Sequence, residues 1–288
     1  MRLRGTLEAM EVRRYSSGCG ALVRGIDLAR FSDVEKHELW KAFLEHGVLF
    51  FVDQRLTPED HIAFAERLGS IVINKFFPEN SAHPEIAEVR KEKEQRTNIG
   101  GGWHADHSYD DAPALGSILV ARELPDAGGD TMFANLYAAY DSLSEGLKRT
   151  LATLRAKHSN RHLYGAHGLY RKSDLAPQLK GEEGVGDAVH PAVITHPESG
   201  RKALYVNPGH TLHFEGWTAS ESQALLSYLY AHATKPEFTC RFRWSPGSVA
   251  FWDNRCTWHY AINDYHGERR LMHRITLEGT PLSAWETR

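Results

Sequence analysis

Trp103-His104-Ala105-Asp106-His107 carries more information on fold and chemistry than any other stretch of these 288 residues. Successive side chains of a β-strand point to opposite faces, so an extended run places His104 and Asp106 side by side. An imidazole and a carboxylate, joined by a second imidazole from elsewhere, form the 2-His-1-carboxylate ligand set of non-haem Fe(II) oxygenases. We expect His259, much later in the chain, to be the second imidazole. His107 would point to the opposite face of the strand and is not expected to bind the ion.

The composition is that of an ordinary globular protein, with 41% hydrophobic and 25% charged residues. A formal net charge of −3 gives no electrostatic basis for binding nucleic acid. No run approaches the ~20 apolar residues of a membrane-spanning helix, and residues 1–8 lack the apolar core of a secretion signal. Cys19, Cys240 and Cys256 are scattered and odd in number, which indicates reduced thiols in the cytoplasm. We therefore expect one cytoplasmic domain, residues 1–288, that binds neither nucleic acid nor membranes.

Three stretches combine a helix N-cap with an amphipathic pattern. The first begins with the capping-box spacing Ser32-x-x-Glu35 and ends at Gly47. The second covers residues 57–69, with a proline at the first helical position, and the third covers residues 218–233.

Short segments rich in β-branched and aromatic residues lie between turn-forming residues. Those predicted to be strands are residues 48–52, 117–121, 131–134, 193–196, 203–206, 239–244, 248–252 and 270–277. Many short strands with a few helices predict a mainly β fold with flanking helices, either a β-sandwich or a jelly roll.

Two segments, about residues 74–102 and 162–187, are predicted to be lid-like. Residues 90–102 change from a charge run to three glycines just before His104, and residues 162–187 are rich in Gly, Lys and Glu. Such stretches are usually solvated loops. Beside a metal site, however, they indicate lids that a substrate orders.

A longer motif surrounds His259: Phe251-Trp252-Asp253-Asn254-Arg255-Cys256-Thr257-Trp258-His259, followed by Arg269-Arg270-Leu271-Met272-His273-Arg274. With Trp103-His104-Ala105-Asp106 and Gly128-Gly129-Asp130-Thr131, the motifs in combination resemble the TauD/TfdA family of Fe(II)- and 2-oxoglutarate-dependent dioxygenases. The resemblance covers about residues 25–279 and looks closest to the taurine dioxygenase branch. It implies a double-stranded β-helix, the cupin-like form of the jelly roll.

The resemblance also implies site residues. His104, Asp106 and His259 match the iron ligands that form the family's catalytic centre. Arg270 matches the arginine that holds the distal carboxylate of 2-oxoglutarate, a contact that suits a planar guanidinium. Thr131 matches the threonine whose hydroxyl bonds the same carboxylate. The implied reaction consumes 2-oxoglutarate and O2, releases succinate and CO2, and hydroxylates the substrate, because related halogenating enzymes lack the carboxylate supplied here by Asp106.

Arg274 is expected to contact the prime substrate. On a strand it would share a face with Arg270, and a buried arginine is costly unless it meets an anion. In the taurine-type enzymes that this chain resembles, the matching arginine holds the sulfonate. The alternative is an internal ion pair with an aspartate or a glutamate.

Three positions depart from the taurine enzymes. Asn74 stands where those enzymes carry a sulfonate-binding histidine, Phe77 replaces a tyrosine, and Gly100 replaces an asparagine that helps to hold the amine. The resemblance therefore implies a small organic anion with a larger or more apolar body than taurine: a sulfonate, a sulfate ester or an aryloxyalkanoate. The residues expected around it are Asn74, Phe76, Phe77, Tyr109, Tyr164, His210 and Phe214, although aromatic residues more often belong to a core.

Two other functions fit a His/Asp/His site. A zinc hydrolase can use the same three ligands with an open water position, but it has no use for a carboxylate clamp at Arg270 and Thr131. A non-catalytic jelly-roll binding protein is the second alternative. Cys256, three residues before His259, is expected to be a small buried side chain rather than a ligand. Helices outside the roll predict a homo-oligomer, either a dimer or a tetramer.

Overall fold

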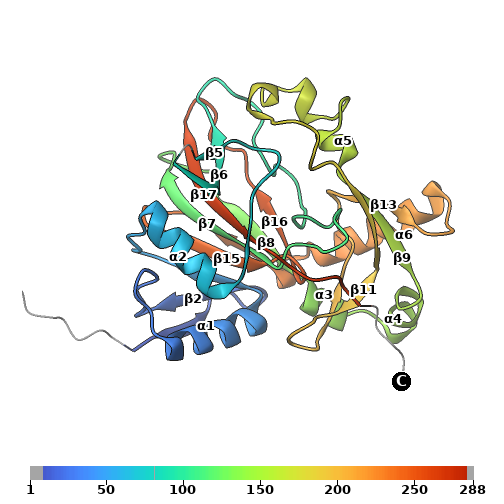
Figure 1. Ribbon diagram of the computed structural model, residues 1–288. Coiled ribbons are helices and arrows are strands. Elements are labelled where there is room, and N and C mark those ends of the chain that lie inside the picture. Colours follow the sequence, from blue (N-terminus) through green and yellow to red (C-terminus); the bar gives the residue numbers. More distant parts are fainter. Residues whose placement is uncertain (1–8, 81, 284–288) are drawn as a thin grey trace, which may run out of the picture.

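The structure, a computed structural model, describes residues 9–80 and 82–283. Residues 1–8, whose sequence predicts no secretion signal, lie outside these ranges. In the part of the chain that is described, no helix is long and apolar enough to span a membrane. The elements form a mainly β fold with flanking helices, as predicted, and Figure 1 shows their arrangement.

The three predicted helices are confirmed, and their ends follow from local chemistry. The helix α1 (Asp33–His46) begins at a capping box, in which Ser32 and Glu35 each accept a hydrogen bond from the backbone of the other. It ends at Gly47, whose φ of 71° lies in the left-handed region that favours glycine. The helices α2 (Pro58–Leu68) and α6 (Ala219–Ala233) begin at the same kind of box, at Thr57 and Thr218.

Nine strands form one large sheet. Their order is β1 (Glu11–Arg14), β2 (Ala21–Arg24), β3 (Val48–Phe51), β15 (Val249–Asp253), β7 (Gly116–Glu123), β17 (Arg270–Leu277), β6 (His83–Lys91) and β5 (Glu79–Asn80), with β4 (Ile71–Val72) paired to β17. The strands β2 and β3 run parallel, and the other neighbouring pairs are antiparallel.

Both faces of the large sheet are covered, which explains why β3 is an uninterrupted apolar run, Val48-Leu49-Phe50-Phe51, with every residue buried. On one face, Phe251 packs against α1 and α2, and its ring stacks on that of Phe43 at 3.9 Å. On the other face, alternate residues such as Leu119 and Trp252 pack against a second, smaller sheet.

The smaller sheet has the order β14 (Thr239–Phe242), β8 (Thr131–Asn135) and β16 (Thr257–Ala261). Phe133 of β8 and Phe242 of β14 meet Phe50 of the large sheet, with ring centroids 5.4 and 4.2 Å from it. This core joins the two sheets of the roll. The strand β16 places His259 on the inner side of the roll, between the two sheets.

Most of the remaining elements lie around a second core beside the two main sheets, on the right of Figure 1. They are the sheet of β10 (Asp187–Pro191), β9 (Arg155–Ser159) and β13 (Thr211–Phe214), the pair β11 (Val193–Thr195) and β12 (Lys202–Leu204), the helices α3 (Leu136–Asp141) and α4 (Glu145–Leu151), and the 3₁₀ turn η3 (Pro236–Phe238). A separate cluster with Phe76 and Phe77 includes residues of the short helix α5 (Arg161–Tyr164) and of the 3₁₀ turn η1 (Tyr170–Lys172), and the 3₁₀ turn η2 (Ala176–Gln178) follows it.

The segment of residues 74–102 is not one loop. It contains β5 and β6, and β6 is hydrogen-bonded to β17 along residues 87–91, so the longer irregular part, residues 92–102, begins after Lys91. Residues 162–187 consist mainly of loop and 3₁₀ turns until β10 begins at Asp187. The charge run is therefore partly a sheet strand, and closure of either segment stays a prediction.

Candidate active site

His104 and His259 are brought together by backbone pairing. The amide of each donates to the carbonyl of the other, at 3.1 and 2.9 Å, and the ring centroids are 4.1 Å apart. The expected strand through Asp106 is wrong, because His104 forms only an isolated bridge and residues 106–109 form a turn. His107 adopts a φ of 58° in this turn, and its Nδ1 lies 2.8 Å from Asp110. Because a turn replaces the extended strand here, the alternation of side chains along a strand does not explain the position of the Asp106 carboxylate.

Even so, the side chains of His104, Asp106 and His259 converge. One donor atom from each lies within 4.8 Å of the other two. Nε2 of His104 is 3.7 Å from Oδ1 of Asp106, and Nε2 of His259 is 3.7 Å from Oδ2. His107 and Cys256 contribute no donor to this group.

The electrostatics keep Asp106 ionised. Burial alone would raise its pKa, but the guanidinium of Arg274, followed by His259 and His104, holds the pKa well below its usual range. Burial, together with His104, lowers the pKa of His259 well below that of a free histidine. An anionic carboxylate and a neutral imidazole are the forms in which these side chains bind metals.

The hydrogen bonds around the histidines fit a metal ion. Nδ1 of His104 lies 2.8 Å from the carbonyl of Gly102, so Nδ1 carries a proton and Nε2 is the nitrogen available to a metal. Nδ1 of His259 is buried without a partner, and the ring packs against Trp252 and Phe133. Two imidazoles and one carboxylate suit Fe(II), with further positions open to cosubstrates.

Arg270 and Thr131 are both neighbours of Trp244. The Arg270 guanidinium carbon is 5.8 Å from the centre of the indole, whose Nε1 donates to Thr131 Oγ1 at 3.0 Å. Because an indole N–H only donates, the Thr131 hydroxyl proton remains free for another acceptor. Nε and Nη2 of Arg270 are buried without partners, and burial lowers the pKa of this arginine. Two unpartnered guanidinium nitrogens and a free hydroxyl proton, both next to Trp244, suit the carboxylate of 2-oxoglutarate.

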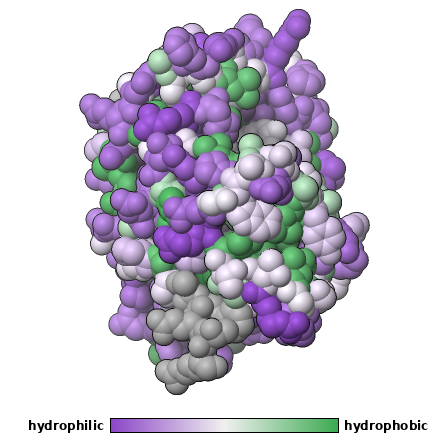
Figure 2. Space-filling view, turned by 90° about the vertical axis from the view of Figure 1, so that its right-hand side faces the viewer, coloured by the Kyte–Doolittle hydropathy of each residue, from purple (hydrophilic) through white to green (hydrophobic). Residues whose placement is uncertain are grey.

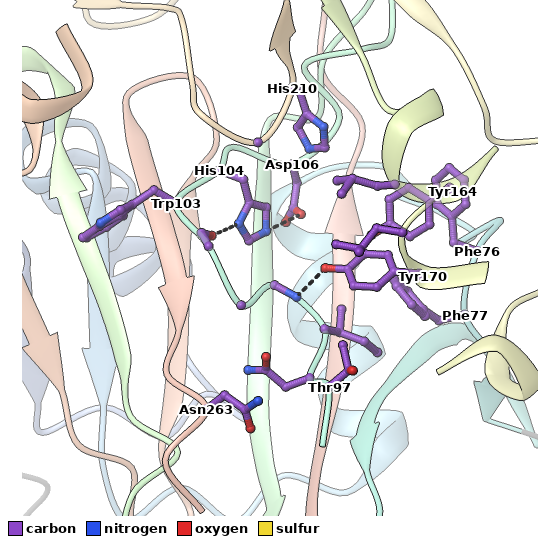
Figure 3. Close-up of a pocket in the computed structure, with 18 of the residues that line it drawn as sticks. Phe76, Phe77, Thr97, Trp103, His104, Asp106, Tyr164, Tyr170, His210 and Asn263 are labelled. Carbon is purple, nitrogen blue, oxygen red and sulfur yellow. Dashed lines mark hydrogen bonds and ion pairs between the residues drawn. The ribbon is translucent and has the colours of Figure 1, made fainter. Parts of the chain in front are cut away.

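A cavity of 480 Å³ opens beside His104 and Asp106. Figure 3 shows aromatic side chains gathered on one side of it, with Thr97 and Asn263 at another end. The larger apolar residues of the wall include Phe76, Phe77, Tyr109, Tyr164, Leu169 and Tyr170. Of the residues predicted to surround a substrate, His210 and Arg274 also line the cavity. His210 is 3% exposed, and its Nδ1 has no partner.

Arg274 reaches both the cavity and the metal-binding carboxylate. Its Nη1 lies 3.3 Å from each carboxylate oxygen of Asp106, so the internal ion pair considered as an alternative is present. Its Nε, however, is buried without a partner. The guanidinium therefore retains a donor that no acceptor uses, and Arg274 is one of the residues that line the cavity.

Two predicted contacts lie elsewhere. Asn74 is not in the lining of the cavity, because its Oδ1 accepts hydrogen bonds from the amides of Phe76 and Phe77, both at 2.9 Å. This turn orients the two phenylalanines, and Asn74 thereby shapes the wall indirectly. Phe214 is fully buried in the second core and is also absent from the lining.

Two residues at the site lack an individual signal in the sequence. Ser117 of β7 donates a hydrogen bond to Oδ2 of Asp106 at 3.0 Å. The hydroxyl oxygen of Tyr170 accepts from the amide of Gly100 at 3.3 Å and so ties residues 162–187 to the glycine-rich loop. Strand alternation could have placed Ser117 on the inner face, but nothing local pairs it with Asp106.

Comparisons with known proteins follow the same direction. The taurine catabolism dioxygenase TauD, TfdA family matches this chain over residues 11–276. An alkylsulfatase from Acinetobacter baylyi is 37% identical over 281 residues, covering 94% of this chain and 86% of that protein. A (S)-phenoxypropionate/alpha-ketoglutarate-dioxygenase from Sphingobium herbicidovorans is 35% identical over 289 residues, covering 96% and 97%. The structure also superposes on that of a taurine dioxygenase from Burkholderia xenovorans, with a TM-score of 0.81, 34% identity and coverage of 98% and 93%.

Proposed function

Because this chain belongs to the taurine catabolism dioxygenase TauD/TfdA family, we propose that it hydroxylates a small organic anion: a sulfonate, a sulfate ester or an aryloxyalkanoate. The enzyme is a 2-oxoglutarate-dependent dioxygenase with the family's double-stranded β-helix fold, and it uses Fe(II). This excludes the zinc hydrolase and the non-catalytic binding protein. When bound, the iron supplies the redox chemistry by which O2 oxidises 2-oxoglutarate to succinate and CO2 and hydroxylates the substrate.

In this proposal, His104, Asp106 and His259 hold the metal. Their convergence within 4.8 Å, with Asp106 ionised, supports the assignment. Arg270 and Thr131 hold the distal carboxylate of 2-oxoglutarate through the unpartnered guanidinium nitrogens and the free hydroxyl proton. These side chains bind and orient, and they leave the redox chemistry to the metal.

Arg274, which lines an aromatic-walled cavity beside Asp106 and keeps an unpartnered Nε, carries the substrate assignment. An acidic group bonded to Arg274 would direct the adjacent carbon toward the metal while Phe77, Tyr109 and His210 enclose its body. The named relatives support this class, since phenoxypropionate is a carboxylate joined to an aromatic ether and an alkyl sulfate is an anion on an apolar chain. Taurine fits less well, because the wall is mainly apolar where a free amine would need partners.

We further propose that the enzyme works in the cytoplasm as a homo-oligomer. Three free, buried cysteines suit a reducing compartment. The side of the molecule that carries β13 and α6 is mainly hydrophilic, with hydrophobic residues gathered near its middle (Figure 2). Leu212 on β13 and Tyr228 on α6 are 42% and 53% exposed, which suits an interface between subunits.

A substrate panel tests the proposed function. The enzyme is assayed with Fe(II), 2-oxoglutarate and O2 against alkylsulfonates, alkyl sulfates, aryloxyalkanoates and taurine. Hydroxylation beside the heteroatom gives an unstable product that releases sulfite from a sulfonate, sulfate from a sulfate ester or a phenol from an aryloxyalkanoate. Succinate formation that depends on one of these anions is expected. Succinate formation that none of these organic anions stimulates would contradict the proposal.

A pair of variants separates the two arginines. Arg274→Gln is expected to raise the KM for the organic anion roughly 10- to 100-fold, the range of a lost charge-assisted hydrogen bond, with little change in the KM for 2-oxoglutarate. Arg270→Gln is expected to do the reverse. Because Arg274 also contacts Asp106, metal affinity is measured in both variants. Equal effects of Arg274→Gln on both KM values would defeat the assignment.

A further inference from the structure

Ser117 meets the metal-binding carboxylate from inside the large sheet. It lies on β7 directly opposite Trp252 of β15 and has no exposed surface. Its neighbour Ile118 points toward α1 and α2, so alternation turns Ser117 to the inner face, where Oγ is 3.0 Å from Oδ2 of Asp106.

The direction of this hydrogen bond is fixed by two further residues. The indole Nε1 of Trp252 donates to Oδ1 of Asn254 at 2.9 Å, and Nδ2 of Asn254 donates to Oγ of Ser117 at 3.2 Å. An indole N–H can only donate, so it determines which end of the amide faces it. The amide NH2 must then face Ser117, whose Oγ accepts and whose single proton is left for the ionised carboxylate of Asp106.

Asn254 is itself held rigidly. It lies in the turn between β15 and β16, and its backbone N–H donates to the backbone carbonyl of Leu115 at 3.0 Å. Its neighbours Asp253 and Arg255 form a buried ion pair at 2.7 Å, and Arg255 extends it to Glu198. These contacts hold the turn that carries Asn254, so the side chain in the middle of the relay has a fixed position.

We propose that Ser117 is a positioning residue. The Trp252–Asn254–Ser117 relay directs the hydrogen bond of the Ser117 hydroxyl to Oδ2 of Asp106 and so holds this carboxylate in its metal-binding orientation. The inference rests on the assignment of Asp106 as a metal ligand made above. Without the relay, the carboxylate keeps its contacts with Arg274 but gains freedom to rotate. Partners of this kind orient metal ligands, and their loss typically weakens metal affinity about 10- to 100-fold.

Metal affinity gives a readout that does not depend on turnover. Mn(II) ions are titrated into the metal-free enzyme, and unbound Mn(II) is followed by its electron paramagnetic resonance signal. Ser117→Ala is expected to raise the Kd for Mn(II) about 10-fold or more. Asn254→Ala removes only the group that orients the hydroxyl, so a smaller increase is expected. The double variant should lose no more affinity than Ser117→Ala, because the two residues act in one chain.

Two controls keep the relay separate from folding and from the proposed site. Ser222→Ala removes another buried serine hydroxyl, which accepts the amide of Phe214 at 3.0 Å, and it should leave the Kd for Mn(II) unchanged. Asp106→Ala should abolish Mn(II) binding. If Asp106→Ala still binds Mn(II) with wild-type affinity, the proposed metal site itself fails.

A different result would reject the relay but keep the metal site. In that result, Asp106→Ala loses Mn(II) binding, whereas Ser117→Ala binds Mn(II) with wild-type affinity and its metal-free form has the melting temperature of the wild type. Additive losses in the double variant would also overturn it, because independent contacts add. If Ser117→Ala does not fold, Asn254→Ala decides, and an unchanged Kd in that variant rejects the relay.

Discussion

Two buried clusters in this protein each combine a histidine and an aspartate at metal-binding distance, yet they are built for opposite purposes. His104, Asp106 and His259 form the first, and His196, Asp253 and Cys256 form the second. In the second, His196 Nε2 lies 2.9 Å from Asp253, Arg255 bonds both oxygens of the same carboxylate, and His196 Nδ1 accepts the Ser199 amide. Burial, followed by Asp253, raises the pKa of the Cys256 thiol far above its usual value.

The two clusters differ in whether buried polar atoms are left without hydrogen-bond partners. No side-chain nitrogen or oxygen of His196, Asp253 or Arg255 lacks a partner among the described residues. Around the first cluster, by contrast, His259 Nδ1, Arg270 Nε and Arg274 Nε are buried and unpartnered. An unmet buried polar group costs about 1–3 kcal/mol, so it persists only where something else compensates for it. Incomplete hydrogen bonding, rather than residue type, thus distinguishes these two clusters.

The largest expected effect separates the clusters by activity. His259→Leu removes the imidazole but keeps most of the buried volume next to Trp252, 4.6 Å away between ring centroids. Turnover and Mn(II) affinity should fall by more than about 100-fold, beyond the loss of a merely supporting partner. The metal-free protein should be at least as stable as the wild type, because an unpartnered buried nitrogen is removed. Thermal unfolding of the metal-free variant provides the check, and a large loss of stability would erase the contrast.

The second effect should appear in stability. Asp253→Ala leaves the buried guanidinium of Arg255 with Glu198 alone and strips His196 of its acceptor. Breaking a buried ion pair from one side costs about 3–5 kcal/mol. Urea unfolding of the metal-free protein measures this loss, with Ser222→Ala as a control for a single buried hydrogen bond. A cost below about 1 kcal/mol would show that the second cluster is not a structural network.

The smallest effect concerns buried histidines outside both clusters. His61 and His158 are fully buried, and burial lowers the pKa of each to about 3. Above a pH of about 6.5 both histidines are neutral whether the chain is folded or unfolded, so their protonation does not lower the unfolding free energy. As the pH falls from there toward 3, the unfolded chain takes up more protons, and each histidine lowers the unfolding free energy by up to about 1.4 kcal/mol per pH unit.

His61→Leu is the variant that checks this pH dependence, since neither ring nitrogen of His61 has a partner. Urea unfolding between pH 7 and 4 should give a shallower loss of stability in the variant than in the wild type. Parallel curves would assign the acid sensitivity to other groups, including the ligand histidines.

Much of the site follows from the local sequence, but not always for the expected reason. The three predicted ligands converge, although the strand expected to align His104 with Asp106 is a bridge followed by a turn. The sequence predicts a substrate contact at Asn74, yet its oxygen holds the turn that carries Phe76 and Phe77. No local signal marks Ser117, because its partner lies on a different segment. Motifs record residue identity well, whereas contacts between distant segments have no local signal.

By itself, the sequence determined which groups are available: the capping boxes at Ser32, Thr57 and Thr218, the strand-forming runs, and the imidazoles, carboxylate and arginines of the motifs. These features act over a few residues, where spacing and side-chain chemistry suffice. Only the tertiary structure decided which polar groups are paired and which are left open. Hydrogen bonding depends on distances of about 3 Å and on direction, and packing of distant strands alone sets these. The same kinds of residue therefore became a candidate metal site at Asp106 and a closed network at Asp253.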